Sequence, residues 1–277
     1  MRFLKRLICL FFVLSPVAHA FTIFNLNVFD ELQGEWGSGF REQRMGALAE
    51  WLKQEKPDLV VFQEAKGTLP GAKKGGQDSV DAQKIRALYP YRYYVYEMTG
   101  KDGAAYGYWI GAKRKPHLVW SDGFFFPGGV ERKTQGAVWK NLTLGGKKHQ
   151  CLGVLSVHLS YQTSEVRVRE AKWITEWIKG KEMHCKRWVV MGDFNADDDS
   201  PEIRELFSAG FKSLFTEKKP TVGAFNPIRR IYGADIPSKT IDWVLGWGGI
   251  GGAAHVVLDA PVGNVWISDH AGVRVEL

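Results

Sequence analysis

The chain has 277 residues, of which 45% are hydrophobic and 24% are charged. This composition excludes a disordered or fibrous protein and suits one large globular domain. The formal net charge is +7, but three of the basic residues lie within the first twenty positions. Without that segment 34 basic and 30 acidic residues remain, a net charge of +4. A mild positive balance is compatible with a polyanionic substrate and is also common among exported proteins of other kinds.

The N-terminal segment is typical of a secretory signal peptide. Basic residues flank and precede the apolar run at 7–14, and Ala18-His19-Ala20 supplies a small-x-small cleavage pattern. An uncleaved membrane anchor is the disfavoured alternative, because the apolar run is shorter than the ~20 residues that a span needs. We therefore predict a signal peptide at 1–20, a single mature domain at 21–277, no membrane span after cleavage, and a secreted or periplasmic location.

Two cysteines, Cys151 and Cys185, remain after the predicted cleavage, in an oxidising compartment. Each stands at the start of an apolar run that ends in a polar residue. If the two runs are neighbouring parallel strands, the cysteines lie near the same edge of the sheet and could pair. The sequence leaves open a disulfide or two buried thiols.

The expected elements alternate between strand and helix, and no repeat or linker divides the mature chain. Apolar residues recur at helical spacing over 41–56 and 164–178. Ser200-Pro201-Glu202 indicates a helix start, and Gly210 closes that helix. Runs rich in β-formers predict strands at 21–28, 59–63, 91–97, 106–112, 138–144, 152–159, 188–191, 240–245, 255–258 and 272–276. Because a helix separates 152–159 from 188–191, we expect these two strands to be parallel, within a mixed α/β sandwich.

Polar residues lie within or directly after several of these apolar strands. They are Asn25, Glu64, His158, Asp193, Asn195 and Asp242. Functional sites collect at the carboxyl ends of strands in α/β sheets. Any one of these residues alone would more often be a turn former. Several together at one edge favour a metal or an ion-pair network, because a buried carboxylate without a partner is costly.

The order of these motifs resembles the endonuclease/exonuclease/phosphatase superfamily, which includes deoxyribonuclease I and the catalytic subunit of cytolethal distending toxin. The resemblance runs from Phe24-Asn25 to Ser268-Asp269-His270, and the final triplet is specific together with Gly192-Asp193-Phe194-Asn195. Gln63-Glu64 alone would be a weak signal. The resemblance implies the deoxyribonuclease I-like fold, a four-layered α/β sandwich of two packed mixed β-sheets flanked by helices.

The resemblance also implies a metal site. Glu64 with Asn25 looks like the metal-binding pair, and Asp269 resembles the neighbouring acid that orients the metal shell. Oxygen ligands of this kind suit Mg²⁺ or Mn²⁺, with Ca²⁺ as a further candidate.

For the reaction itself, the resemblance implies that Asp193 and Asn195 orient the attacking water and the phosphate. His270 looks like the histidine that a buried carboxylate holds, with Asp242 as that carboxylate, and His158 matches a second histidine. Water attack on a phosphodiester needs cations and a proton acceptor. That acceptor is His270 or Asp193, and the other histidine would protonate the leaving oxygen.

Three further residues are carried over on looser matches. Arg132 lies where deoxyribonuclease I has a phosphate-contacting arginine, Tyr106 resembles a tyrosine of the AP endonucleases, and Thr221 is a candidate phosphate contact. One departure stands out, because deoxyribonuclease I pairs its first histidine with a glutamate on the strand corresponding to 106–112. This chain has Gly107-Tyr108-Trp109 there, so His158 is expected to lack that partner.

The leading interpretation is an exported, metal-dependent DNA endonuclease acting as a monomer. The rival is a phosphodiesterase or phosphatase of a lipid headgroup or small phosphoester. The candidates for membrane-entering aromatic loops, 123–127 and 243–247, read more naturally as core or strand. A catalytically dead binding subunit is disfavoured because every central position is filled. The basic segments 66–84 and Arg229-Arg230 are either phosphate contacts or solvated surface.

Overall fold

The computed structural model describes residues 20–28, 38–67, 81–99, 105–124, 132–232 and 236–277. The predicted signal peptide, apart from Ala20, and most of the basic segment 66–84 lie outside the described residues. In the described part of the chain, no helix has both the length and the apolar character needed to cross a membrane.

Strands and helices follow the predicted order. The helices are α1 (Ser38–Glu55), α2 (Ser164–Lys181) and α3 (Pro201–Ala209), with 3-10 turns η2 (Asp81–Ile85) and η3 (Pro227–Tyr232). The strands are β1 (Thr22–Asn27), β2 (Leu59–Gly67), β3 (Tyr91–Thr99), β4 (Ala105–Ala112), β5 (Leu118–Phe124), β6 (Arg132–Leu144), β7 (Lys147–His158), β8 (Trp188–Asp193), β9 (Lys212–Ser213), β10 (Asp242–Trp247), β11 (Ala253–Val257) and β12 (Gly272–Glu276).

These strands form two mixed sheets of six strands each. Sheet A has the order β11-β12-β1-β2-β4-β3, and sheet B has the order β5-β6-β7-β8-β10-β9. The parallel pairs are β1 with β2 and β7 with β8. The second of these confirms the strand–helix–strand prediction. The first pair places the carboxyl ends of β1 and β2 together, and the second does the same for β7 and β8.

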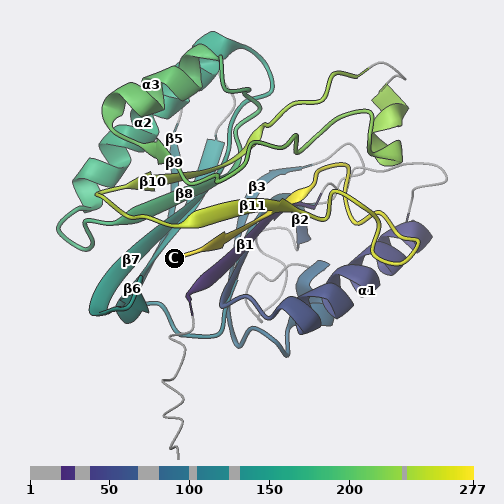
Figure 1. The fold of residues 1–277 in the computed structure, drawn as a ribbon, viewed down its shortest axis with the longest axis horizontal. Helices are drawn as coiled ribbons and strands as arrows, with labels where there is room; N and C mark the ends of the chain where they lie inside the picture. The colour runs from purple at the N-terminus through teal and green to yellow at the C-terminus, as the bar shows by residue number, and fades with distance from the viewer. Residues whose placement is uncertain (1–19, 29–37, 68–80, 100–104, 125–131, 233–235) are drawn as a thin grey trace, which may run out of the picture.

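Four layers result from packing the two sheets face to face (Figure 1). Apolar residues such as Val61, Val154 and Val189 fill the space between the sheets. On the outer face of sheet A, Leu48 and Leu52 of α1 pack on the strands, and α2 and α3 cover sheet B in the same way. The predicted four-layered sandwich is therefore confirmed.

Cys151 and Cys185 form a disulfide, with their Cα atoms 5.7 Å apart. Cys151 lies near the start of β7, and Cys185 lies three residues before β8. The bond therefore joins two neighbouring parallel strands at their amino-terminal ends. This resolves the alternative between a disulfide and two thiols.

Candidate active site

The sheet registers bring three of the predicted residues into one row. His158 ends β7 and is the register partner of Asp193, which ends β8. Asp193 is in turn the partner of Asp242, which begins the antiparallel strand β10. Side chains of register partners project from the same face of a sheet. Sheet B therefore presents an imidazole and two carboxylates side by side toward sheet A.

Asp193 occupies the centre of the site and is almost completely buried. Its Oδ1 accepts a hydrogen bond from the backbone N–H of Asn195 at 2.8 Å. Its Oδ2 lies 3.7 Å from Nε2 of His158 and 3.8 Å from Nε2 of His270. The preceding Gly192 has φ 143°, and a Cβ there would stand 1.9 Å from the carbonyl oxygen of Val157. Only glycine therefore allows β8 to deliver Asp193 at this position.

His270 is held by Asp242, as predicted from the resemblance. Its Nδ1 lies 2.8 Å from Oδ2 of Asp242, and both side chains are buried. Burial opposes charging of the imidazole, but the carboxylates of Asp242 and Asp269 outweigh that effect and raise the pKa of His270 to about 10. Because Nδ1 faces Asp242, Nε2 is left directed at Asp193.

His158 does have a carboxylate partner, contrary to the sequence-based expectation. Glu97 comes from β3, the strand next to the one expected, and its Oε2 lies 3.6 Å from Nδ1 of His158. Tyr108, at the position where an acid was expected, donates a hydrogen bond to Oε1 of Glu97 at 3.1 Å. Burial disfavours the charged imidazole, yet Glu97 followed by Asp193 and Glu64 raises the pKa of His158 to about 9. Both histidines therefore share one arrangement, in which Nδ1 faces a buried carboxylate and Nε2 faces Asp193.

Glu64 reaches the site through an irregularity in β2. The register between β2 and β4 shifts between Phe62 and Ala65, and Glu64 has φ 53°. A bulge of this kind turns successive side chains away from strict alternation. Gln63 and Glu64 consequently both bond to residues of β1 that share one face. Burial, as the largest cause, raises the pKa of the Glu64 carboxyl.

Asn27, not Asn25, is the asparagine at the metal-type carboxylates. Nδ2 of Asn27 donates to Oε1 of Glu64 at 2.9 Å and to Oδ2 of Asp193 at 3.1 Å. Asn25 lies two residues earlier on the same face of β1, where its Oδ1 accepts a hydrogen bond from Nε2 of Gln63 at 2.9 Å. The structure therefore does not place Asn25 beside Glu64. The period-two repeat of a strand makes Asn27 as good a candidate as Asn25, but the family resemblance matches Asn25 alone.

Asp269 lies at the edge of the site with its side chain fully buried. Its Oδ2 accepts from Arg229 at 2.5 Å, and its Oδ1 lies 3.9 Å from Nε2 of His270. The sequence left open whether Arg229 contacts phosphate or is a solvated charge. In the structure it forms an ion pair with Asp269. The hydroxyl of Ser268 donates to the backbone oxygen of Asn27 at 2.6 Å, which fixes the terminal motif against β1.

The hydroxyl oxygen of Thr221, a candidate phosphate contact, is hydrogen-bonded to the backbone of the neighbouring strand. Its side chain is fully buried, and Oγ1 accepts the backbone N–H groups of Ile241 and Asp242, each at 3.1 Å. Thr221 therefore positions the start of β10. Nδ2 of Asn195 is likewise engaged, since it donates to the backbone oxygen of Leu159 at 2.9 Å.

The two remaining candidates are Tyr106 and Arg132. Tyr106 is the second residue of β4. It lies two residues from Tyr108 and therefore on the same face of the strand. The centre of its ring is 5.7 Å from Nζ of Lys66. Its catalytic role stays a prediction. Arg132 begins β6, and its side chain falls outside what the structure describes.

The charges of the site match a divalent cation. Its acidic groups are Glu64, Glu97, Asp193, Asp242 and Asp269, and its basic groups are His158, His270 and Arg229. With both imidazoles protonated, five carboxylates face three cations, so a charge of about −2 is uncompensated. Glu64, His158 and Asp193 present ligand atoms within 4.8 Å of one another, as do Asp193, Asp242 and His270. Oxygen-rich sites with excess negative charge are those that Mg²⁺ and Mn²⁺ occupy, so the donor set fits such an ion.

Solved structures of similar fold include an endonuclease/exonuclease/phosphatase family protein from Leptotrichia buccalis, with a TM-score of 0.71 and 16% identity over 93% of this chain and 99% of that one. A mannosyl-6-phosphatase from Bacteroides thetaiotaomicron has a TM-score of 0.65 and 17% identity, over 93% and 99%. Beta toxin from Staphylococcus aureus has a TM-score of 0.66 and 16% identity, over 92% and 99%. These likenesses concern the fold.

The sequence has no significant match among curated proteins. A family model does match it, from residue 24 to residue 270. That span begins next to the paired asparagines of β1 and ends on the second site histidine. The chain belongs to the endonuclease/exonuclease/phosphatase family, whose members hydrolyse phosphoric esters and generally depend on a divalent metal.

Proposed function

We propose that this protein is an exported phosphodiesterase that uses Mg²⁺ or Mn²⁺ to cut DNA as an endonuclease. The observation that carries the hydrolytic part is the pair of histidines whose Nε2 atoms both lie within 4 Å of Oδ2 of Asp193. Two imidazoles that face one point, each beside a buried carboxylate, can give a proton to a leaving oxygen and, where one of them is deprotonated, take a proton from a water.

Each residue of the site has a distinct role in the proposed reaction. Asp193, whose second oxygen is fixed by a backbone N–H, orients the attacking water between the histidines. His270 and His158 form the acid–base pair. Glu64, with Asn27 and Asp269 beside it, would hold the metal ion. When bound, that ion supplies positive charge that stabilises the additional negative charge on the phosphate.

DNA as the substrate rests on the family and on the net charge of +4 that remains without the first twenty residues. Export rests on the signal-peptide pattern of the first twenty residues. A second candidate function is hydrolysis of a small phosphomonoester or a lipid headgroup. The likeness to a protein described as a mannosyl-6-phosphatase favours the phosphomonoester.

Plasmid nicking separates these functions. The purified mature chain should convert supercoiled plasmid to the nicked form with Mg²⁺, and excess chelator should abolish this conversion. Bis-p-nitrophenyl phosphate and p-nitrophenyl phosphate, assayed in parallel, report diester and monoester hydrolysis. Intact plasmid with rapid monoester hydrolysis would replace the nuclease by the second candidate.

Variants test whether the site described above performs the reaction. His270→Ala and Glu64→Ala should each lower the rate at least about a hundredfold, the usual contribution of a positioned acid–base group or metal ligand. His255→Ala is the matched control. His255 is an exposed residue of β11 whose Nδ1 contacts Oγ1 of Thr216, and it has no role in the proposed reaction. Full activity in either site variant would disprove its assigned role.

A further inference from the structure

A cavity lies at the end of the sandwich opposite the catalytic residues. Its volume is about 290 Å³, and its walls come from the β6–β7 hairpin, the residue before β8, the turn between β10 and β11, and the end of β12. Arg187 precedes β8 and Asp193 ends it, so roughly 20 Å of strand separates the two sites. The cavity is therefore distinct from the proposed active site.

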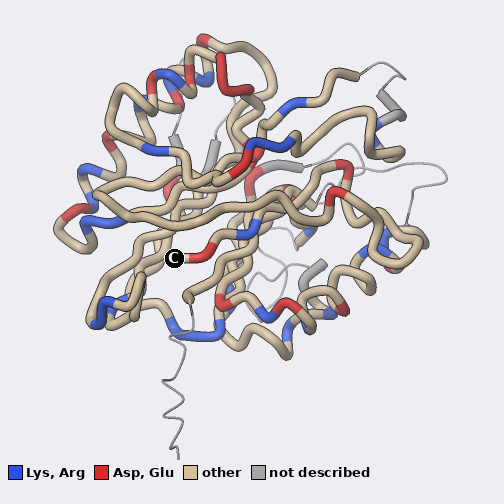
Figure 2. Tube along the Cα trace, viewed as in Figure 1, with Lys and Arg blue, Asp and Glu red and all other residues tan. Residues whose placement is uncertain are grey.

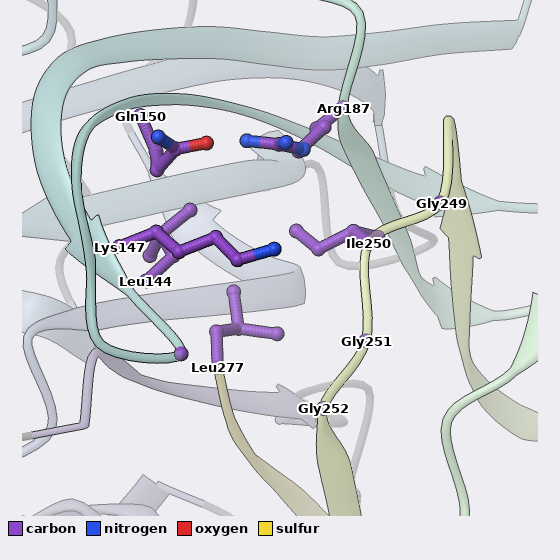
Figure 3. A pocket seen from close by; sticks show the side chains of 10 residues that line it. Leu144, Lys147, Gln150, Arg187, Gly249, Ile250, Gly251, Gly252 and Leu277 are labelled. Carbon is purple, nitrogen blue, oxygen red and sulfur yellow. The ribbon is translucent and has the colours of Figure 1, made fainter.

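The polar lining of this cavity is cationic. Lys147 and Arg187 both line it, together with the uncharged Gln150, and none of the lining residues has an acidic side chain. Figure 3 shows the Lys147 ammonium directed toward Ile250 and the Arg187 guanidinium directed toward the Gln150 carboxamide. No ion pair of Lys147 or Arg187 is found within the described part of the chain. Figure 2 shows basic residues gathered at the same hairpin tip.

The remaining walls suit the body of a small organic anion. Leu144, Ile250 and Leu277 belong to the apolar core between the sheets and form an apolar floor. Gly249 and Gly251 line the opposite wall with open space where a side chain would stand. Backbone N–H groups exposed in glycine turns are common donors to anions. The volume lies near the lower end of the range for ligand pockets, about 300 Å³.

A disulfide links the two backbone segments that carry these cations. The Cys151–Cys185 disulfide joins the strand that carries Lys147 to the segment that carries Arg187. Two cations that line one cavity repel each other, and a bound anion would relieve this repulsion. Arginine matches phosphate oxygens with two parallel hydrogen bonds, and lysine adds a point charge.

We propose that this cavity binds a small phosphate monoester of about the size of glycerol phosphate, with Lys147 and Arg187 on the phosphate and the apolar floor under the organic part. The site is separate from the hydrolytic function proposed above and does not depend on it. Its phosphate-bearing ligand would come from solution, and a lipid headgroup with the same chemistry is the alternative source.

Titration of the ¹⁵N-labelled, chelator-treated protein with glycerol phosphate tests the proposal. The amide signals of Gly249 and Gly251 should shift on binding, which distinguishes this cavity from the active site. Lys147→Gln with Arg187→Gln should weaken binding at least about tenfold, because the phosphate loses both of its charge-assisted hydrogen-bond donors. Lys148→Gln, a neighbouring cation outside the cavity lining, is the matched control and should bind as the wild type does.

Several results would overturn the proposal. These are an absence of shifts at the two glycines, equal binding by the double variant, or equally tight binding of acetate. Vesicles containing phosphatidylglycerol distinguish the source of the ligand. Vesicle binding that requires both cations, with no binding of glycerol phosphate, would refute a ligand from solution. The double variant should retain full hydrolytic activity, so that failure here is separable from failure of the proposed function.

Discussion

Replacing Glu97 by glutamine should change the protonation of His158. The substitution keeps the size of the side chain but removes the charge that lies 3.6 Å from Nδ1. Burial lowers the pKa of His158, whereas Glu97, Asp193 and Glu64 raise it, to about 9 in balance. The difference between this pKa and the ordinary value of 6.5 corresponds to a free energy of about 3 kcal/mol in favour of the charged imidazole. Because Glu97 is the largest of the three contributors, we expect the pKa to fall by at least about one unit, roughly 1.4 kcal/mol.

The same substitution should change how stability depends on pH. The pKa of His158 is higher in the folded protein than in the unfolded chain. The stabilisation is therefore fully present below pH 6.5 and is lost as the pH rises through about 9. In the presence of chelator, the free energy of unfolding of the wild type should fall more steeply between these pH values than that of Glu97→Gln. Urea denaturation at a series of pH values measures this difference.

An NMR titration of the imidazole signals measures the pKa directly in the metal-free protein. Tyr108→Phe is the control, because it removes a hydrogen bond to Glu97 while the carboxylate charge stays. It should lower the pKa of His158 less than Glu97→Gln does. An unchanged pKa in Glu97→Gln would refute the assignment of Glu97 as the partner that holds this histidine charged.

Three further outcomes are expected. Asn27→Ala should reduce hydrolysis at least about tenfold by removing a donor shared by two site carboxylates, and more than Asn25→Ala does; the reverse order in a rate assay would favour Asn25 as the site residue. Thr221→Val should cost about 2–4 kcal/mol in urea denaturation, because two buried N–H groups lose their acceptor, and a cost near zero would contradict this role. Changing both Cys151 and Cys185 to serine should cost about 4 kcal/mol for a closed loop of this length, and an unchanged denaturation midpoint would argue against a structural disulfide.

Much of the architecture could be predicted because it depends on local patterns. Apolar periodicity marked α2 and its flanking strands, and a right-handed βαβ connection leaves little freedom, so β7 and β8 had to lie close and parallel. That arrangement brought His158 and Asp193 into one register row. The order of strands within each sheet was not predictable in this way, because it depends on contacts between residues far apart in the chain.

The class of chemistry could be predicted from the sequence, because the motifs at Asp193 and His270 together resemble those of one family of phosphoesterases. The neighbours that complete the site depend on the tertiary structure. The bulge at Glu64 and the depth of β1 between the sheets select Asn27 over Asn25. Glu97 enters from the edge strand of the other sheet. Such partners are fixed by how two sheets pack against one another, and that packing leaves no periodic signal in either strand.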